Sequence, residues 1–144
     1  KNKYGNDIKI VKVKDLTRGA VESCLSAKKY INNNYPLSIF TVDVAFEPKF
    51  SKKTIPKNCD GFLLTFNANS TNYSYAKINK KGFVEKTEEK KIISNDALVG
   101  IYNFKHGKMF VKFAEEMISN NILSNNEFFI APMYNLFNTE KFKN

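Results

Sequence analysis

The sequence predicts an α/β fold with a mixed, mostly parallel sheet, and two features support this prediction. Residues 8–13 alternate loosely as a strand does, residues 17–31 carry apolar side chains on one helical face, and residues 38–43 form an apolar run. A strand, a helix of roughly 15 residues and a second strand form a βαβ unit, which predicts parallel pairing. The second feature is a series of apolar runs between polar turns, which completes one layered domain in this 144-residue chain.

The helix over residues 17–31 has a predicted start and a predicted end. Thr17 is a plausible N-cap, since its hydroxyl can accept a hydrogen bond from a free backbone N–H group. Residues 32–34 are all asparagine and end the helix, and Pro36 prevents it from resuming. Gly19 lies in the first turn, where glycine lowers helix propensity. It is either an ordinary loop-to-helix glycine or a position where a flat ligand or a phosphate approaches the backbone.

The run over residues 38–43 is predicted to be a short buried strand that ends in a carboxylate. Its β-branched residues, Ile39, Thr41 and Val42, favour a strand covered on both faces. Asp43 would stand at the C-terminal end of the strand, which is the edge where ligands bind in open α/β sheets. There it could hold a divalent cation against a phosphate. The alternative is an aspartate that caps a helix or stabilises a turn.

The remaining elements are predicted from apolar runs and turn residues. Residues 44–60 are irregular and predict a surface excursion or a short helix. A buried strand over 61–66, a polar loop over 67–72 and a hairpin over 73–87 that turns at Gly82 are predicted next. They are followed by a buried strand over 97–104, an amphipathic helix that starts at Gly107 and ends at residues 120–121, and a second helix within 127–137 with Pro132 near its first turn.

Composition limits the partners of this chain. The formal net charge is +9, which taken alone suggests an anionic partner. The basic residues are scattered and include one arginine, Arg18, so nucleic acid is disfavoured and a small phosphorylated ligand fits better. No apolar run approaches the ~20 residues that span a bilayer. Cys24 and Cys59 are expected to be free thiols in the cytoplasm. The chain begins at Lys1, so we expect it to be part of something longer.

An ordered series of motifs resembles a known enzyme family. The block Leu16-Thr-Arg-Gly-Ala20, a helix and the strand to Asp43 resemble the second βαβ unit of the sugar-nucleotide pyrophosphorylases. These are NTP-dependent nucleotidyltransferases with a GT-A-like Rossmann fold. The later motifs follow in the family's order: Tyr73-Ser-Tyr75, Gly82-Phe-Val84, Glu89-Lys90, residues 93–102 and residues 126–135. The resemblance implies a three-layer fold that is incomplete here, with residues 1–144 forming the central and C-terminal part of one domain.

The resemblance also implies a reaction. The family transfers a nucleoside monophosphate from an NTP to a sugar 1-phosphate or a similar phosphorylated acceptor and releases pyrophosphate. The implied setting is cytoplasmic synthesis of a surface polysaccharide, either capsule or lipooligosaccharide. The resemblance implies that Asp43 binds Mg²⁺, and that Thr17 and Gly19 bind substrate on the nucleotide side. It implies that Lys90 contacts the acceptor phosphate and that Glu89 binds acceptor hydroxyls. The implied lining of the acceptor pocket is Ser74, Gly100, Tyr102 and Glu127. A solvated charge run over residues 85–91 is the alternative for Glu89 and Lys90.

Two departures from the family pattern leave alternatives open. The family's glycine-rich phosphate loop and its second metal-binding aspartate have no counterpart in residues 1–144, so we expect these residues alone to be inactive. One alternative is a GT-A-type glycosyltransferase, although it would want an aspartate two residues after Asp43, where the chain has Ala45. The other is a non-catalytic scaffold remnant. The helices rich in phenylalanine and methionine could also pack on a partner subunit in a homo-oligomer.

Overall fold

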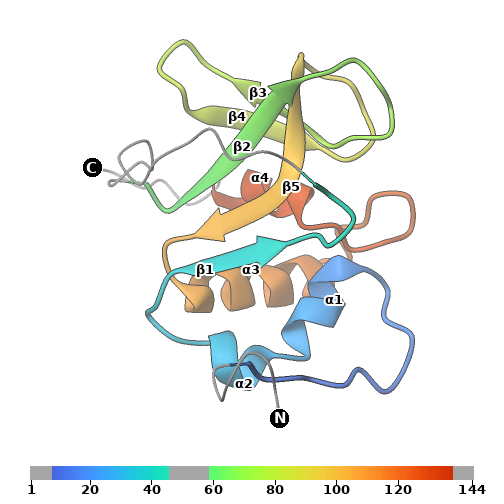
Figure 1. The fold of residues 1–144 in the computed structure, drawn as a ribbon, viewed down its shortest axis with the longest axis vertical. Helices are drawn as coiled ribbons and strands as arrows, with labels where there is room; N and C mark the ends of the chain where they lie inside the picture. Colours follow the sequence, from blue (N-terminus) through green and yellow to red (C-terminus); the bar gives the residue numbers. More distant parts are fainter. Residues whose placement is uncertain (1–7, 46–58, 138–144) are drawn as a thin grey trace.

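The computed structural model describes residues 8–45 and 59–137, in which a five-stranded sheet packs against helices (Figure 1). The strands are β1 (Leu37–Phe40), β2 (Gly61–Asn67), β3 (Tyr75–Ile78), β4 (Val84–Glu88) and β5 (Asp96–Phe104). The helices are α1 (Ala20–Leu25), α2 (Lys28–Ile31), α3 (Gly107–Ser119), the 3₁₀ helix η3 (Ala131–Met133) and α4 (Tyr134–Phe137).

Every strand pair of the described sheet is antiparallel, so the prediction of a mostly parallel sheet is wrong. The order is β1-β5-β3-β4, and β2 pairs with β5 as well. The βαβ unit fails because residues 8–13 are not a strand in this structure. Ile8, Ile10 and Val13 are exposed, Ile10 to 85%, and Val11 is half-buried. Without that first strand, β1 pairs only with β5, which runs in the opposite direction.

Two short helices replace the single helix predicted over residues 17–31. After Leu25 the backbone hydrogen bonds change from the α-helical spacing to the tighter 3₁₀ spacing. The Ala27 N–H donates to the Cys24 carbonyl and the Tyr30 N–H donates to the Ala27 carbonyl, three residues back in each case. The N-cap is Gly19 and not Thr17.

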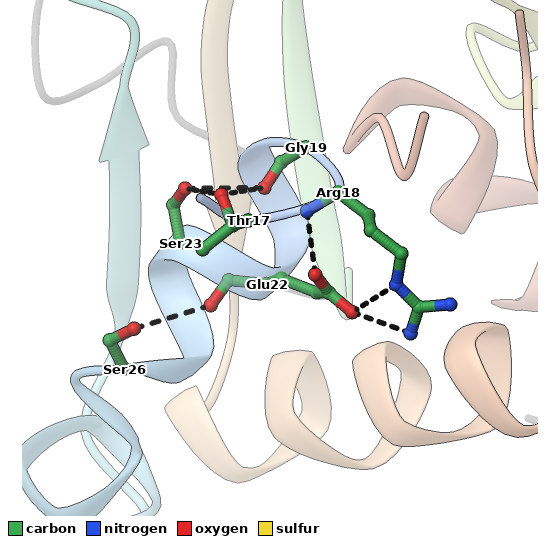
Figure 2. Close-up of polar contacts among 6 residues, drawn as sticks. All are labelled: Thr17, Arg18, Gly19, Glu22, Ser23 and Ser26. Carbon is green, nitrogen blue, oxygen red and sulfur yellow. Dashed lines mark hydrogen bonds and ion pairs between the residues drawn. The ribbon is translucent and has the colours of Figure 1, made fainter. Parts of the chain in front are cut away.

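The Glu22 side chain caps the backbone at the start of α1 (Figure 2). The Glu22 carboxylate accepts a hydrogen bond from the Arg18 backbone N–H at 2.7 Å and pairs with the Arg18 guanidinium. This is close to a capping box, in which an acidic side chain in the first turn reaches back to a free backbone N–H group. The Thr17 hydroxyl contributes by bonding to the Ser23 hydroxyl at 2.7 Å and to the Gly19 carbonyl at 3.3 Å. The prediction therefore located the start of the helix correctly, but the side chain that binds the free backbone N–H group there belongs to Glu22 and not to Thr17.

The strand predicted over 38–43 is shorter and more exposed than expected. β1 ends at Phe40, and its residues alternate between half-buried and exposed. Phe40 itself is 51% exposed. Burial on both faces is therefore wrong for this strand, which has one neighbour in the described sheet.

The elements from residue 61 onward largely confirm the sequence predictions. β2, the β3–β4 hairpin, β5 and α3 occur where they were expected, and Gly82 has a φ of 84° at the hairpin turn. The last segment holds η3 and α4 in place of one continuous helix, with Pro132 in the first turn of η3. The expectation for residues 44–60 falls mostly on 46–58, outside the described residues.

The core lies between the sheet and α3. Tyr102 and Phe104 of β5 point into it, and the Phe104 ring meets the rings of Phe110 and Tyr134, each at a centroid distance of 5.3 Å. The two short helices α1 and α2 pack on the other side of α3. This core holds β5 in place, and β5 carries Gly100 and Tyr102, two of the predicted site residues.

Candidate functional site

Three of the predicted site residues come together where β3 begins and β4 ends, against the side of β5. Ser74 precedes β3, Glu89 follows β4, and Tyr102 belongs to β5. The Ser74 hydroxyl donates a hydrogen bond to the Glu89 carboxylate. Ser74 is 9% exposed and Tyr102 is 7% exposed, so both polar side chains are held inside the protein. Buried polar groups of this kind are normally hydrogen-bonded, and here they satisfy one another.

The electrostatics of the cluster follow from its burial. Burial raises the pKa of Glu89, and the charge of Glu127 raises it further, while the Ser74 hydrogen bond and Lys90 oppose the shift. The pKa of Tyr102 is raised to about 12, first by burial and then by Glu89 and Asp43, and the Ser74 hydrogen bond opposes this shift. Tyr102 is a neutral phenol at physiological pH, as an unperturbed tyrosine also is, and its hydroxyl is hydrogen-bonded to Ser74 within the cluster.

Lys90 follows Glu89 in an unusual backbone conformation. Its φ is 53°, in the left-handed region that non-glycine residues rarely adopt. The side chain is exposed, and its ammonium group lies 5.4 Å from the centre of the Phe129 ring. A cation on an aromatic face gains a modest attraction, so Phe129 holds the charge near the cluster. Such strained positions occur preferentially at functional sites, which supports a ligand-binding role for Lys90.

Glu127 reaches the cluster from a tight turn. Ser124 and Glu127 exchange both backbone hydrogen bonds, at 3.0 and 2.9 Å. Asn125 and Asn126 between them have φ values of 47° and 64°, as the type I′ turn requires and as asparagine tolerates. Glu127 is exposed, and its charge acts on Glu89. It is therefore at the edge of the cluster.

Asp43 stands beyond the end of β1 and not at the C-terminal end of a strand. It is exposed, and it lies at a cavity of about 470 Å³. The other lining residues are Val44, Ala45, Phe66, Tyr73, Leu98 and Val99. Phe66 and Tyr73 meet edge to face with ring centroids 5.0 Å apart. Since Tyr73 adjoins Ser74 and the charge of Asp43 acts on Tyr102, this cavity and the Ser74–Glu89–Tyr102 cluster are neighbours.

Gly100 has a structural explanation in this arrangement. Its φ is 89°, and a β-carbon there would lie 2.3 Å from the Thr41 hydroxyl oxygen. The Thr41 N–H and hydroxyl groups both donate to the Gly100 carbonyl at 3.1 Å. Gly100 thus lets β5 bind the segment that leads to Asp43. A direct contact of Gly100 with an acceptor stays a prediction.

Thr17 and Gly19 form a separate group around residue 128. Gly19 has a φ of 133°, and a β-carbon there would lie 2.7 Å from both the N and the O atom of Phe128. The Phe128 backbone donates to Arg18 at 2.8 Å and accepts from Val21 at 3.1 Å. Packing against Phe128 therefore explains the glycine. The predicted role of Thr17 and Gly19 in binding the nucleotide stays a prediction.

The residues present fit Mg²⁺ as a partial site only. Within residues 8–45 and 59–137, no group of three or more His, Cys, Asp or Glu side chains could hold a metal ion. Mg²⁺ is often bound through one or two carboxylates while waters and substrate phosphates complete its shell. The exposed Asp43 carboxylate matches that mode of binding, and a metal cage made by the protein alone does not.

Sequence reasoning predicted Tyr102 but missed three other aromatic residues of the site. Phe66 and Tyr73 line the cavity, and Phe129 supports Lys90. Tyr73 could have been found, because it precedes the predicted site residue Ser74 at the start of a predicted hairpin. Phe129 is one of two adjacent phenylalanines, and nothing in the pattern separates it from Phe128, which is fully buried in the core.

The pH dependence of stability tests the burial of Glu89. Because the folded pKa of Glu89 is raised above the ordinary value of 4.5, its stabilising contribution is complete below that value and is lost as pH rises through the folded pKa. Urea unfolding of wild type and Glu89→Gln at about pH 4 and about pH 7 should show the glutamine variant gaining stability relative to wild type at the higher pH. Glu88→Gln, one residue earlier, is the matched control. If the free energy of unfolding of Glu89→Gln minus that of wild type stays constant or becomes smaller at the higher pH, the burial of Glu89 is contradicted.

The fold is mixed α/β, and by the structural comparisons that follow it is similar to part of a nucleotidyltransferase fold. Comparison with protein-family models gives no match, and neither does comparison with curated proteins. Among solved structures, the chain is similar to the nucleoside-diphosphate-sugar pyrophosphorylase from Vibrio cholerae RC9, with a TM-score of 0.76 and 27% identity over 89% of this chain and 56% of that one.

A second solved structure shows the same fold. It is a Bacillus anthracis protein proposed to be a glucose-1-phosphate thymidylyltransferase, in complex with a sucrose, with a TM-score of 0.70 and 18% identity over 90% of this chain and 52% of that one. The chain is therefore a structural match to sugar-nucleotide pyrophosphorylases and spans about half the length of each matched structure. Among the described residues, no helix has the length and apolar character that crossing a membrane requires.

Proposed function

We propose that this chain supplies the acceptor-binding part of a nucleotidyltransferase. The whole enzyme would transfer a nucleoside monophosphate from an NTP to a sugar 1-phosphate or a similar phosphorylated acceptor, with release of pyrophosphate. The observation that supports this proposal is the buried Ser74–Glu89–Tyr102 cluster with Lys90 at its edge. The similarity to a sugar-nucleotide pyrophosphorylase over 89% of the chain supports the same class.

Each residue of the cluster has a role that its chemistry allows. Lys90 provides a charge-assisted hydrogen bond to the acceptor phosphate. Glu89 accepts hydrogen bonds from acceptor hydroxyls, and its bond from Ser74 fixes the carboxylate for that purpose. Tyr102 would line the acceptor pocket, with its hydroxyl hydrogen-bonded to Ser74. Transfer of this kind depends on positioning the two substrates and stabilising the developing charge.

Asp43 would serve the nucleotide side of the reaction. Its exposed carboxylate would hold Mg²⁺ together with substrate phosphates and water. When bound, Mg²⁺ neutralises charge on the phosphate that is transferred. The cavity beside Asp43 would offer the apolar surface of Phe66 and Tyr73 on that side of the acceptor. Thr17 and Gly19 would lie towards the nucleotide, and Gly100 and Glu127 towards the acceptor.

The wider setting is part of the same proposal. Residues 1–144 would be the central and C-terminal part of one catalytic domain, acting in the cytoplasm on a precursor of surface polysaccharide. Neither a nucleic acid nor a membrane is a partner in this account.

An assay of pyrophosphate release tests the proposed reaction. The natural full-length protein is incubated with Mg²⁺, each of CTP, UTP, dTTP and GTP, and a panel of sugar 1-phosphates and non-sugar phosphorylated acceptors. We expect release with one NTP and one acceptor class. Absence of release with every pair would overturn the proposal.

Replacement of Lys90 tests the acceptor site within that assay. Lys90→Met removes a charge-assisted hydrogen bond, so kcat/KM for the acceptor should fall by about 10- to 100-fold while KM for the NTP stays unchanged. Lys91→Met is the matched control, because Lys91 is the next exposed lysine and belongs to no contact described above. Equal effects of the two variants would remove Lys90 from the site.

A further inference from the structure

A side-chain amide takes the place of a strand partner at the edge of the sheet. Within the described sheet, β4 is the outermost strand beside β3. At Thr87 its outer edge is covered by Asn135, whose Oδ1 atom accepts from the Thr87 N–H at 2.8 Å and whose Nδ2 atom donates to the Thr87 carbonyl at 2.9 Å. This is the pair of bonds that a neighbouring antiparallel strand exchanges with one residue. Thr87 is 0% exposed, so no water replaces them.

Two more contacts hold the same end of β4 from the segment over residues 129–135. The Thr87 hydroxyl donates to the Ala131 carbonyl at 2.6 Å and also contacts Asn135 Oδ1 at 3.2 Å. The Phe129 ring lies 5.4 Å from the Lys90 ammonium group. The structure thus fixes the end of β4 from its outer side, immediately before the chain leaves the sheet.

The position of Thr87 decides where Glu89 and Lys90 lie. Glu89 is two residues beyond Thr87, and Lys90 turns the backbone sharply with its φ of 53°. Glu89 is also tied to Ser74, which precedes β3 on the inner side of the hairpin. A shift of β4 relative to β3 would therefore separate Glu89 from Ser74 and move Lys90 with it.

We propose that Asn135 is a positioning residue for Glu89 and Lys90, acting through the Thr87 backbone. The inference rests on the proposed acceptor-binding function of that pair. Asn135 holds the end of β4 so that the carboxylate and the ammonium group face one acceptor. The competing view is that Asn135 only satisfies two buried backbone groups and so contributes to stability alone.

Three variants separate these views. Asn135→Ala removes both bonds to the Thr87 backbone. Asn79→Ala is the matched control at the opposite end of the hairpin, because the Asn79 side chain accepts from Lys81 and Phe83 N–H at 2.9 and 3.1 Å. Thr87→Val removes the hydroxyl contacts to the Ala131 carbonyl and to Asn135 Oδ1 and keeps both backbone bonds to Asn135, so it reports what the hydroxyl adds to the hold on β4. Kinetic constants for acceptor and NTP, thermal stability, and NMR shifts of the backbone amides are measured for each full-length variant.

The expected result is selective. Asn135→Ala should raise KM for the acceptor about tenfold and leave KM for the NTP within about twofold, because only the acceptor groups are displaced. The amides of Glu89 and Lys90 should shift in this variant. Asn79→Ala should lower stability and leave KM for the acceptor unchanged, and Thr87→Val should raise that KM by less than Asn135→Ala does.

Other results overturn the inference. It fails if Asn135→Ala changes both KM values equally or matches Asn79→Ala in every constant. If Asn135→Ala does not fold, Asn135→Asp keeps the size and the oxygen that accepts from Thr87, and an unchanged acceptor KM in that variant overturns the inference. If wild type releases no pyrophosphate, the proposed function fails separately. The amide shifts then decide the inference, and it is overturned if Glu89 and Lys90 do not move or move equally in Asn79→Ala.

Discussion

Asp43→Asn is expected to lower kcat about 100- to 1,000-fold in the full-length protein, because it removes the carboxylate proposed to hold Mg²⁺ at the transferred phosphate. Asparagine has nearly the same size and is neutral. Because Asp43 is exposed, the change should alter the free energy of unfolding by no more than about 0.5 kcal/mol. Pyrophosphate release at saturating acceptor and NTP measures the effect.

Asp15→Asn is the matched control for Asp43, since Asp15 is also exposed and lies outside the site. It should keep the wild-type rate. If Asp43→Asn retains activity within about twofold, Asp43 is not a metal ligand of the reaction, even if the class of enzyme is right. Raising the Mg²⁺ concentration should restore little of the lost rate if the carboxylate also orients the phosphates.

Gly19→Ala is expected to destabilise the fold more than any other single change considered in this account. Gly19 combines a φ of 133° with backbone atoms of Phe128 only 2.7 Å from the position of a β-carbon. Backbone strain and steric overlap each cost about 1–3 kcal/mol, so the free energy of unfolding should fall by about 3 kcal/mol or more. Urea denaturation of both proteins measures the change.

Gly82→Ala separates the two causes. Gly82 has a φ of 84°, and nothing lies within 4 Å of a β-carbon built there. This variant should cost about 1–2 kcal/mol from backbone strain alone. The excess in Gly19→Ala then reports the contact with Phe128. An alanine at residue 19 that costs no more than one at residue 82 would contradict that contact.

The sequence predicted the second half of this fold well because its signals are local. The apolar stripe of α3, the apolar run of β5 and the glycine at the β3–β4 turn each specify an element without reference to distant residues. The pairing direction of β1 could not be predicted from local signals. Whether residues 37–40 run parallel or antiparallel to a neighbour depends on which strand lies beside them, and residues 8–13 do not provide that strand in this structure.

The candidate site was predictable where it rested on an ordered series of motifs. Ser74, Glu89 and Tyr102 are far apart in the sequence, and the resemblance grouped them before the structure brought them together. The two glycines show the limit of this reasoning. Gly19 and Gly100 matched family positions, but the structure explains them by close contacts with Phe128 and Thr41. The two hydrogen bonds between the Asn135 side chain and the Thr87 backbone were not predictable, since they depend on which segment packs along the outer edge of β4 in the folded chain.

The central claim, that this chain binds a phosphorylated acceptor at Ser74, Glu89, Lys90 and Tyr102, is tested most directly by NMR titration of the labelled protein. Glucose 1-phosphate, phosphocholine and phosphoserine are added in turn, with glucose, choline and serine as matched controls without phosphate. The account predicts saturable shifts at these four residues with one phosphorylated compound and none with its control. Shifts that cluster elsewhere, or that the control reproduces, would contradict it.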